Sequence, residues 1–301
     1  MSSWTHTHSF TLPAAPSRVF AALTTAAELE RWFAEHVEVD ARAGGVFRSW
    51  GRFTYGAPSK KAGGAITACE RDRVLTFEWT FDGVPSRVSW TLDRDASDSE
   101  KTKLALTHAF DRRSGLGYEQ ELVDDLWRLI MGNLDAHLRG GSGIVRPDFT
   151  NPDAEIRLSI VIDAPREKVF RALTDPEVMA KWFSLPSSKP PVVEPRAGGT
   201  YDLGWTYEMY GKQVTAGTTR ILDIVENERL VTDWLDWRGD ATRKSQRLAW
   251  LLEDVGGKTK VTLVHDGFER PADMGDYPFG WVYFLDALKK AAEGTNSPVL
   301  P

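Results

Sequence analysis

The sequence predicts an α+β protein made of two copies of one domain, each a curved antiparallel sheet wrapped around a long C-terminal helix. Three observations predict this. The length of 301 residues suits two domains. Residues 17–33 recur as residues 167–183, with Val-Phe, Ala-Leu-Thr and a closing Trp-Phe at the same spacing. Each copy also runs from a strand pattern, through short helices and several β-type segments, to a long helical pattern.

Each copy opens with a strand and two short helices. Residues 156–162 alternate apolar and polar side chains like a strand, and residues 10–12 are the shorter counterpart. A proline follows each strand, and apolar residues then recur every three or four positions over residues 19–33 and 169–183, which indicates a buried helical face. In the second copy Asp175-Pro176 supplies a cap and a first-turn proline, so we expect the helical segment to divide there.

The middle of each copy is predicted to be an antiparallel meander. Segments rich in Val, Thr, Phe and Trp, separated by Gly, Asp and Asn, are typical of strands joined by turns. They recur in the same order in both copies, as residues 42–47 and 196–201, 75–79 and 230–234, 88–92 and 248–252, and 104–110 and 261–268. The Gly-Gly pair before the first of these strands, Gly44-Gly45 or Gly198-Gly199, indicates a tight turn or bulge.

The closing segment of each copy is helical, over residues 122–138 and 277–288, with an apolar stripe that must pack against the sheet. Between the copies, Gly140-Gly141-Ser142-Gly143 and Pro147 have the composition of a linker. We therefore expect a first domain over residues 1–147 and a second over residues 148–301.

Composition excludes several classes of function. The chain carries 37 Lys and Arg against 43 Asp and Glu, so its net charge of −6 offers no field for a nucleic-acid backbone. No apolar run approaches the roughly 18 residues of a membrane span. The polar residues 1–8 lack the apolar core of a signal peptide, so we expect a cytoplasmic protein. The one cysteine, Cys69, excludes an internal disulfide.

Aromatic side chains supply the candidate ligand site. Alternation places Val88, Trp90 and Leu92 on one face of a strand, and His108 shares the corresponding face of the next strand. This face should meet the closing helix, where the rings either fill a closed core or line an apolar cavity for a small molecule. The candidate ligand-binding residues are the repeated tryptophans and histidines: Trp79, Trp90, His108 and Trp127 in the first copy, and Trp234, Trp250, His265 and Trp281 in the second.

The sequence offers no repeated catalytic constellation. No Ser, Cys, Asp or second His recurs beside His108 and His265, so we expect no catalytic residue and no cofactor. Glu78 and Asp233 recur beside a Trp, but alternation places them on the opposite, solvated face. His6 and His8 have no third ligand near them in the sequence, so no metal site is expected there.

Taken together, these motifs resemble the START-related SRPBCC superfamily. The resemblance rests on Ala-Pro before Val-Phe-x-Ala-Leu-Thr, then Trp-Phe, Arg-Ala-Gly-Gly before an aromatic residue, a late strand that ends in His, and the closing helix. Within the superfamily the chain is most similar to the branch named after the activator of the ninety-kilodalton heat-shock chaperone ATPase. The resemblance implies two helix-grip domains with a hydrophobic cavity between sheet and helix. It implies a better-formed pocket in the second copy, because the first lacks the Gly280-Trp281 pair.

Three hypotheses of function follow. The first is a binder of a hydrophobic or aromatic small molecule or lipid, acting as a carrier, in sequestration or in self-resistance. The second is an enzyme of the cyclase, aromatase or hydrolase type acting on such a molecule, as in a minority of the superfamily. The third is a protein-interaction or co-chaperone module, although the separate chaperone-binding domain of the eukaryotic activator is absent from this sequence. The missing catalytic constellation favours the first, and the oligomeric state stays open.

Overall fold

A computed structural model describes residues 3–54, 63–81, 83–113, 115, 119–185, 188–209, 212–215, 217–236 and 246–295. The chain divides into two compact units, residues 1–152 with 271–279 and residues 153–270 with 280–301. The first unit contains the first predicted repeat together with residues 271–279, and the second unit contains the rest of the second repeat.

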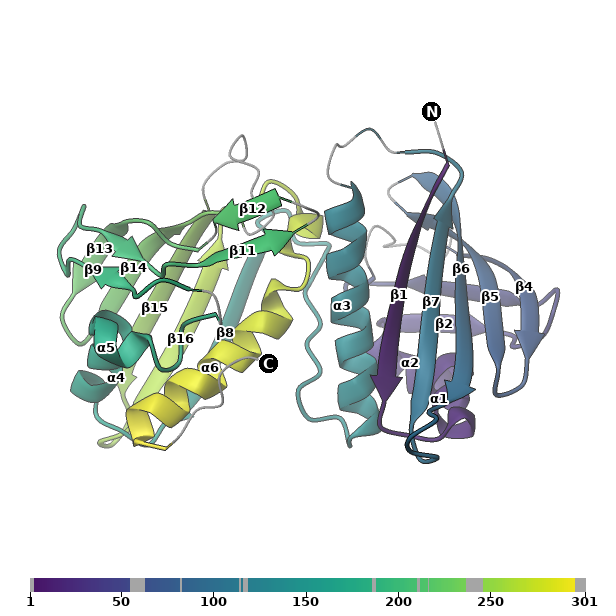
Figure 1. Cartoon of the computed structure of the whole chain (residues 1–301), viewed down its shortest axis with the longest axis horizontal. Helices are drawn as coiled ribbons and strands as arrows, with labels where there is room; N and C mark the ends of the chain where they lie inside the picture. The colour runs from purple at the N-terminus through teal and green to yellow at the C-terminus, as the bar shows by residue number, and fades with distance from the viewer. Residues whose placement is uncertain are drawn as a thin grey trace. The chain divides into compact units, whose positions relative to one another are not determined.

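The first repeat is a seven-stranded antiparallel sheet with a long C-terminal helix (Figure 1). Its sheet has the order β1-β7-β6-β5-β4-β3-β2, so the opening strand pairs with the closing one. The elements are β1 (Trp4–Leu12), α1 (Pro16–Thr24), α2 (Ala26–Trp32), β2 (His36–Val39), β3 (Val46–Trp50), β4 (Gly63–Glu70), β5 (Val74–Phe81), β6 (Val84–Arg94), β7 (Thr102–Phe110) and α3 (Glu119–Leu138).

The second repeat keeps this plan with a smaller main sheet. Its five strands have the order β13-β14-β15-β16-β8, and the chain between α5 and β13 forms two separate strand pairs, β9 with β10 and β11 with β12. The elements are β8 (Glu155–Ile162), α4 (Arg166–Thr174), α5 (Pro176–Met179), β9 (Val192–Val193), β10 (Tyr201–Asp202), β11 (Thr206–Met209), β12 (Lys212–Thr215), β13 (Ile221–Val225), β14 (Arg229–Trp234), β15 (Gln246–Asp254), β16 (Thr259–Asp266), a 3-10 turn (Pro271–Met274) and α6 (Tyr277–Glu293).

The strand register confirms the duplication. In the first repeat His6 of β1 lies opposite His108 of β7, and in the second Ile156 of β8 lies opposite His265 of β16. Trp90 and Trp250 likewise occupy one position, because they lie opposite Leu106 and Leu263. The α+β class predicted from the sequence, with a sheet and a long C-terminal helix in each copy, is therefore confirmed.

The two repeats share the same spacing from the first short helix to the Trp that follows it, and a hydrogen bond explains this spacing. The indole nitrogen of Trp32 donates a hydrogen bond to the carbonyl of Ala22 at 3.3 Å, and that of Trp182 donates to Ala172 at 2.9 Å. Each Trp thus satisfies a carbonyl near the end of the preceding helix, where no intrahelical donor remains. The cap of α5 is as predicted, because the Asp175 side chain accepts from the backbone N–H of Glu177 at 3.0 Å.

The repeated Gly-Gly pair forms a turn that only glycine fits. Gly44 and Gly198 have φ angles of 79° and 74°, in the left-handed region. A Cβ on Gly45 would lie 2.0 Å from the Asp40 carbonyl oxygen, and one on Gly199 would lie 2.2 Å from that of Glu194. The first glycine therefore supplies the backbone angle and the second permits the close approach.

Among the helices that the structure describes, none joins the length to the apolarity that a membrane crossing requires. This agrees with the absence of long apolar runs in the sequence.

Candidate functional site

A Trp-His hydrogen bond joins the long helix to the last strand in both repeats. The indole nitrogen of Trp127 donates to Nδ1 of His108 at 3.1 Å, and that of Trp281 donates to Nδ1 of His265 at 3.0 Å. Because an indole N–H can only donate, Nδ1 of each histidine must be the unprotonated acceptor. The proton of the neutral imidazole therefore lies on Nε2.

The second ring nitrogen of each histidine also has a protein partner. Nε2 of His108 lies 3.0 Å from the hydroxyl of Ser86, and Nε2 of His265 lies 2.8 Å from Oε1 of Gln246. The Ser86 hydroxyl donates onward to the carbonyl of Trp79 at 3.2 Å, and the Gln246 amide donates to Asp236 at 3.3 Å. Each histidine is thus the centre of a buried chain of hydrogen bonds.

Burial keeps both histidines neutral. Desolvation lowers the pKa of His265 to about 3. Desolvation also lowers the pKa of His108 well below its usual value, with a smaller contribution from nearby His6. Neither side chain is exposed to solvent. At neutral pH each imidazole therefore acts as a fixed donor and acceptor in the core rather than as a titrating group.

The eight candidate residues come together as two clusters of four, one in each repeat. In the first, the Trp127 ring packs edge to face on Trp79 at 5.6 Å and on Trp90 at 6.1 Å between ring centroids. In the second, Trp281 lies 4.9 Å from Trp234 and 6.1 Å from Trp250, also edge to face. These rings are fully or almost fully buried. They form the centre of each core, and their role in binding a ligand stays a prediction.

Two indole N–H groups within these clusters lack partners. Nε1 of Trp90 and Nε1 of Trp250 are buried and have no hydrogen-bond acceptor among the described residues. The two tryptophans are equivalent in the strand register, so the same unsatisfied donor occurs twice. A buried donor without a partner is uncommon in proteins and costs free energy.

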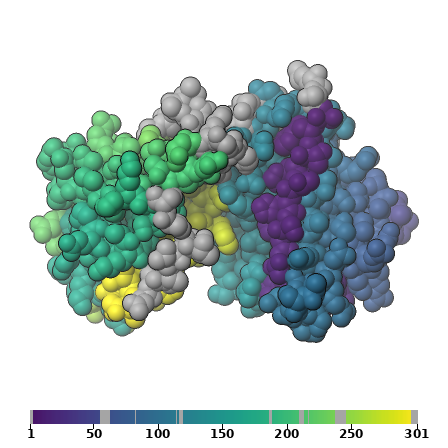
Figure 2. Space-filling model, viewed as in Figure 1, coloured from purple at the N-terminus to yellow at the C-terminus, as the bar shows by residue number. Residues whose placement is uncertain are grey.

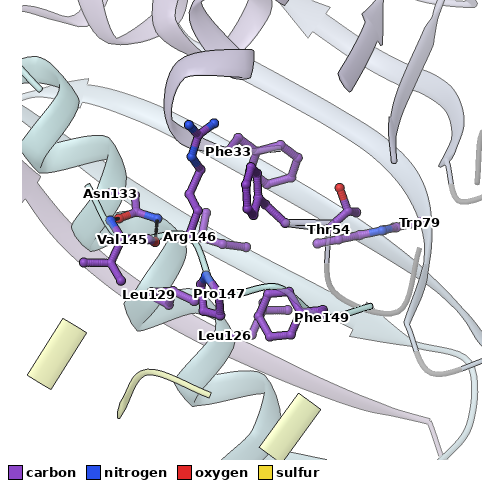
Figure 3. A pocket seen from close by; sticks show the side chains of 12 residues that line it. Phe33, Thr54, Trp79, Leu126, Leu129, Asn133, Val145, Arg146, Pro147 and Phe149 are labelled. Carbon is purple, nitrogen blue, oxygen red and sulfur yellow. Dashed lines mark hydrogen bonds between the residues drawn. The ribbon is translucent and has the colours of Figure 1, made fainter. Parts of the chain in front are cut away.

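A cavity of about 20 Å³ lies in the first repeat between α3, α2 and the sheet (Figure 3). Its walls are mostly aromatic and aliphatic, and one side is closed by the segment 145–149, which follows α3. The lining residues are Phe33, Phe53, Thr54, Trp79, Leu126, Leu129, Ile130, Asn133, Val145, Arg146, Pro147 and Phe149. Of the eight candidate residues, Trp79 is the one that lines it. The sequence favoured a pocket in the second repeat beside Trp234, Trp250 and Trp281, and these rings pack on one another there. That second pocket stays a prediction.

The segment 145–149 is held to the first repeat by specific contacts. Asn133 of α3 exchanges two hydrogen bonds with the backbone of Val145, donating at 2.7 Å and accepting at 2.9 Å. Arg146 donates to the carbonyl of Glu30 at 2.9 Å, and its guanidinium lies 4.6 Å from the ring centroid of Phe53. The backbone N–H of Phe149 donates to the carbonyl of Arg52 at 2.8 Å. We call this segment the cover of the cavity.

Sequence reasoning missed the cover and Thr54. The Gly and Pro content around residues 140–147 indicated only a linker. The alternation of apolar residues in the cover, at Val145, Pro147 and Phe149, was the available signal that this stretch packs against the domain.

Asp233 corrects one expectation. Alternation placed it on a solvated face, but its side chain is buried and accepts three hydrogen bonds. They come from the backbone N–H groups of Thr219 at 2.8 Å and Arg220 at 2.9 Å, and from the Thr219 hydroxyl at 2.6 Å. The irregular segment before β13 runs beside β14, where Gly217 pairs with Leu235, and its N–H groups are directed at this carboxylate. Its counterpart Glu78 is exposed, as expected.

An antiparallel sheet with a long C-terminal helix, present twice, defines the chain as a tandem helix-grip protein. The family model described as Activator of Hsp90 ATPase homolog 1-like protein matches residues 13–139 and 163–293, once in each repeat. The chain therefore belongs to this family, which confirms the resemblance noted from the sequence. No curated protein matches the chain.

Several solved structures are similar to the chain. DynU16, from the dynemicin biosynthetic locus, is 19% identical over 96% of this chain and 98% of its own, with a TM-score of 0.41. CalU16 from Micromonospora echinospora is 26% identical over 46% of this chain and 76% of its own, with a TM-score of 0.38. BexL, a di-domain ARO/CYC of the BE-7585A biosynthetic pathway, is 16% identical over 99% of this chain and 100% of its own, with a TM-score of 0.39.

Proposed function

We propose that the protein binds a flat, hydrophobic small molecule in the first repeat, between α3 and the sheet. The observation that carries this proposal is the cavity itself, which has apolar and aromatic walls and one buried hydroxyl without a partner. A mostly apolar recess with a few polar groups is the usual form of a small-molecule site.

The walls supply the affinity in this proposal. Phe33, Trp79 and Phe149 offer ring faces and edges, and Leu126 and Ile130 of α3 offer aliphatic surface. Burying apolar surface contributes about 25 cal/mol per Å², so a ligand that buries ~300 Å² gains ~7 kcal/mol before the cost of association. An uncharged molecule can therefore bind without an ion pair.

Thr54 supplies the polar contact. Its hydroxyl oxygen is buried and has no hydrogen-bond partner among the described residues. The other polar side chains of the wall, Asn133 and Arg146, are already engaged with Val145 and Glu30. We therefore infer that the ligand carries an oxygen, as in a carbonyl or phenol, that pairs with the Thr54 hydroxyl.

Binding requires the cover to move. A volume of about 20 Å³ holds roughly one water molecule, far less than a polycyclic ligand needs. The cover is attached by a few hydrogen bonds and by the partly buried Phe149, so it is the wall most easily displaced. The ligand would then take the place of the Phe149 ring on Trp79 and α3.

The other sequence-predicted residues of the first repeat support the wall of the cavity in this proposal. Trp90, Trp127 and His108 would hold Trp79 in place. Trp234, Trp250, His265 and Trp281 form the corresponding core of the second repeat and take no part in this proposed site. A catalytic version of the proposal would need a titrating group, and both histidines are already engaged through both ring nitrogens.

The test is a titration of the full chain with a panel of polycyclic phenols, matched hydrocarbons and fatty acids. Intrinsic Trp fluorescence reports binding at each step. We expect Leu126→Trp, which fills the cavity, to abolish binding. Thr54→Val should weaken a phenol about 3–10-fold, the equivalent of one net hydrogen bond, and leave the matched hydrocarbon unchanged. Thr232→Val is the matched control, because Thr232 also has a buried, unpartnered hydroxyl but lies in the second repeat.

Binding that survives Leu126→Trp, or a phenol that Thr54→Val binds as tightly as the wild type does, would overturn the proposed site. The ligand is recovered after incubation and analysed by mass spectrometry. A chemically altered ligand would replace the binding proposal with the catalytic alternative.

A further inference from the structure

A cluster of three metal-ligating side chains lies apart from the cavity, between β1 and α3. His6 and His8 occupy alternate positions of β1 and so share one face of the strand. Asp124 of α3 faces them, and one ligand atom of each residue lies within 4.8 Å of the other two. The long helix thus supplies the third ligand that the sequence around His6 and His8 lacks.

Contacts within the protein do not account for this arrangement. Oδ1 of Asp124 lies 3.8 Å from Nε2 of His6 and 3.7 Å from Nδ1 of His8, both beyond hydrogen-bond distance. Nε2 of His6 is buried and has no hydrogen-bond partner among the described residues. Leaving a buried polar atom unpaired costs about 1–3 kcal/mol. We therefore expect a bound group to contact Nε2 of His6.

We propose that His6, His8 and Asp124 bind a divalent transition-metal ion, with Zn²⁺ as the best fit. Two imidazole nitrogens and one carboxylate oxygen form a common ligand set for Zn²⁺. Zinc–ligand distances of about 2.1 Å place tetrahedral ligands roughly 3.4 Å apart, so the three atoms need to move by about 1 Å or less. Three protein ligands leave a fourth position for water or another molecule.

The site is accessible from solvent on one side. The side chain of His6 is 7% exposed, whereas those of Asp124 and His8 are 17% and 36% exposed. Figure 2 shows β1, in purple, at the surface of the first repeat, and on the strand face that carries the cluster His8 is more exposed than His6. A metal ion can therefore enter past His8, with His6 at the buried end.

The surrounding charges orient the carboxylate. Arg128, one helical turn beyond Asp124, lies 3.5 Å from Oδ2, the oxygen that does not face the histidines. The same guanidinium donates to Asp125 at 2.8 Å, which offsets its positive charge. Holding one carboxylate oxygen in this way leaves the other directed at the metal position, as outer partners of metal ligands commonly do.

The second repeat lacks the whole cluster. Ile156 and Leu158 of β8 occupy the positions of His6 and His8, since they lie opposite His265 and Leu263 as the histidines lie opposite His108 and Leu106. Pro278 precedes Trp281 by three residues, as Asp124 precedes Trp127. The helix-grip frame therefore forms without these three polar residues, and the cluster is an addition to one repeat.

The experiment is Zn²⁺ binding to the full chain without a histidine tag, after treatment with a chelator. Isothermal titration calorimetry should give one Zn²⁺ per chain, and Co²⁺ should give the visible absorption of a tetrahedral N/O site. His8→Gln and Asp124→Asn should each weaken Zn²⁺ binding at least ~10–100-fold. Losing a residue that only hydrogen-bonds to a metal ligand already lowers metal affinity by this factor. His36→Gln, which changes an exposed histidine outside the cluster, should bind like the wild type.

Thermal unfolding separates loss of the site from loss of the fold. Zn²⁺ should raise the melting temperature of the wild type and of His36→Gln, and should leave the variants of the cluster unchanged. A chain that binds no Zn²⁺ at one equivalent, or cluster variants that bind it as tightly as the wild type does, would overturn the proposal. His8 is partly exposed, so His8→Gln keeps the test valid if the buried substitutions impair folding.

Discussion

The indole nitrogen of Trp281 donates a hydrogen bond to Nδ1 of His265 at 3.0 Å, and Trp127 repeats this contact with His108 at 3.1 Å. In each repeat the bond joins the long helix to the last strand at the centre of the core. It sets the tautomer of the histidine and thereby the direction in which Nε2–H donates, to Gln246 or to Ser86. Each repeat therefore uses an equivalent Trp-His pair to fix the position of its long helix on its sheet.

The first prediction compares two tryptophans of the second repeat. Trp281→Phe leaves Nδ1 of His265 buried without a donor, whereas Trp250→Phe removes an N–H that has no acceptor. Both changes lose a similar ring volume. We expect Trp281→Phe to lower the free energy of unfolding by about 1–3 kcal/mol more than Trp250→Phe, the cost of a buried unpaired group. Urea unfolding followed by circular dichroism measures the difference.

Trp127→Phe and Trp90→Phe form the same pair in the first repeat and should show the same order. Equal losses for both members of a pair would mean that ring packing, and not the Trp-His hydrogen bond, stabilises the contact between helix and sheet.

The second prediction concerns pH. The pKa of His265 is lowered to about 3 in the folded chain, while an unfolded histidine titrates near 6.5. Below pH 6.5 the unfolded chain therefore takes up a proton that the folded chain does not, and stability falls as the pH falls from about 6.5 towards 3. His265 alone should contribute a slope of roughly 1 kcal/mol per pH unit in this range.

His265→Asn tests this origin, because an amide can accept from Trp281 and does not titrate. We expect the variant to be less stable at pH 7, since the smaller side chain leaves a cavity, and to lose less stability than the wild type between pH 7 and pH 5. Urea midpoints at the two pH values give the slopes. Parallel slopes for the two proteins would exclude His265 as the titrating group.

The fold could be predicted from the sequence because its determinants are local and occur twice. The Trp of the Trp-Phe pair hydrogen-bonds to the neighbouring helix, only ten residues earlier in the chain. The Gly44-Gly45 turn needs glycine because of its own backbone angle and the nearby carbonyl of Asp40. Strand alternation identifies which side chains face the helix. It does not tell a ring that fills a core from one that lines a cavity, since both are apolar and both point inward.

The remaining features depend on segments that are distant in the sequence. The cover reaches the domain through Asn133 and Glu30, and Asp124 lies more than a hundred residues from His6 and His8. The burial of Asp233 arises because the irregular segment beside β14 directs two backbone N–H groups at its carboxylate, which alternation cannot reveal. Such contacts follow from tertiary packing, and the local sequence of one segment does not show which distant segment it meets.

The third prediction separates Asp233 from its counterpart Glu78. Asp233→Ala leaves two backbone N–H groups and the Thr219 hydroxyl without their acceptor, so we expect a loss of about 2–4 kcal/mol in the free energy of unfolding. Asp233→Asn should recover most of this, because its amide oxygen can still accept from the backbone. Glu78→Ala changes an exposed side chain and should stay within about 0.5 kcal/mol of the wild type. Urea unfolding of the three variants provides the comparison. An unchanged free energy of unfolding for Asp233→Ala would show that the segment before β13 does not depend on this carboxylate.

The fourth prediction concerns the cover of the cavity in the first repeat. Asn133 holds the backbone of Val145 through two hydrogen bonds, and Asn133→Ala removes both while leaving the bond from the Phe149 N–H to Arg52 in place. A net contribution of about 0.5–1.5 kcal/mol for each bond corresponds to roughly 5–150-fold faster exchange of the Val145 amide hydrogen. The Phe149 amide serves as the control within the same segment and should change less, because its acceptor is unaffected.

If the cover is the wall that a ligand displaces, Asn133→Ala should also speed ligand association in stopped-flow Trp fluorescence, since part of the free-energy cost of opening the cover has been removed beforehand. Faster exchange at Val145 without faster association would mean that the cover opens on a path the ligand does not use, and unchanged exchange would show that Asn133 does not hold the cover in solution.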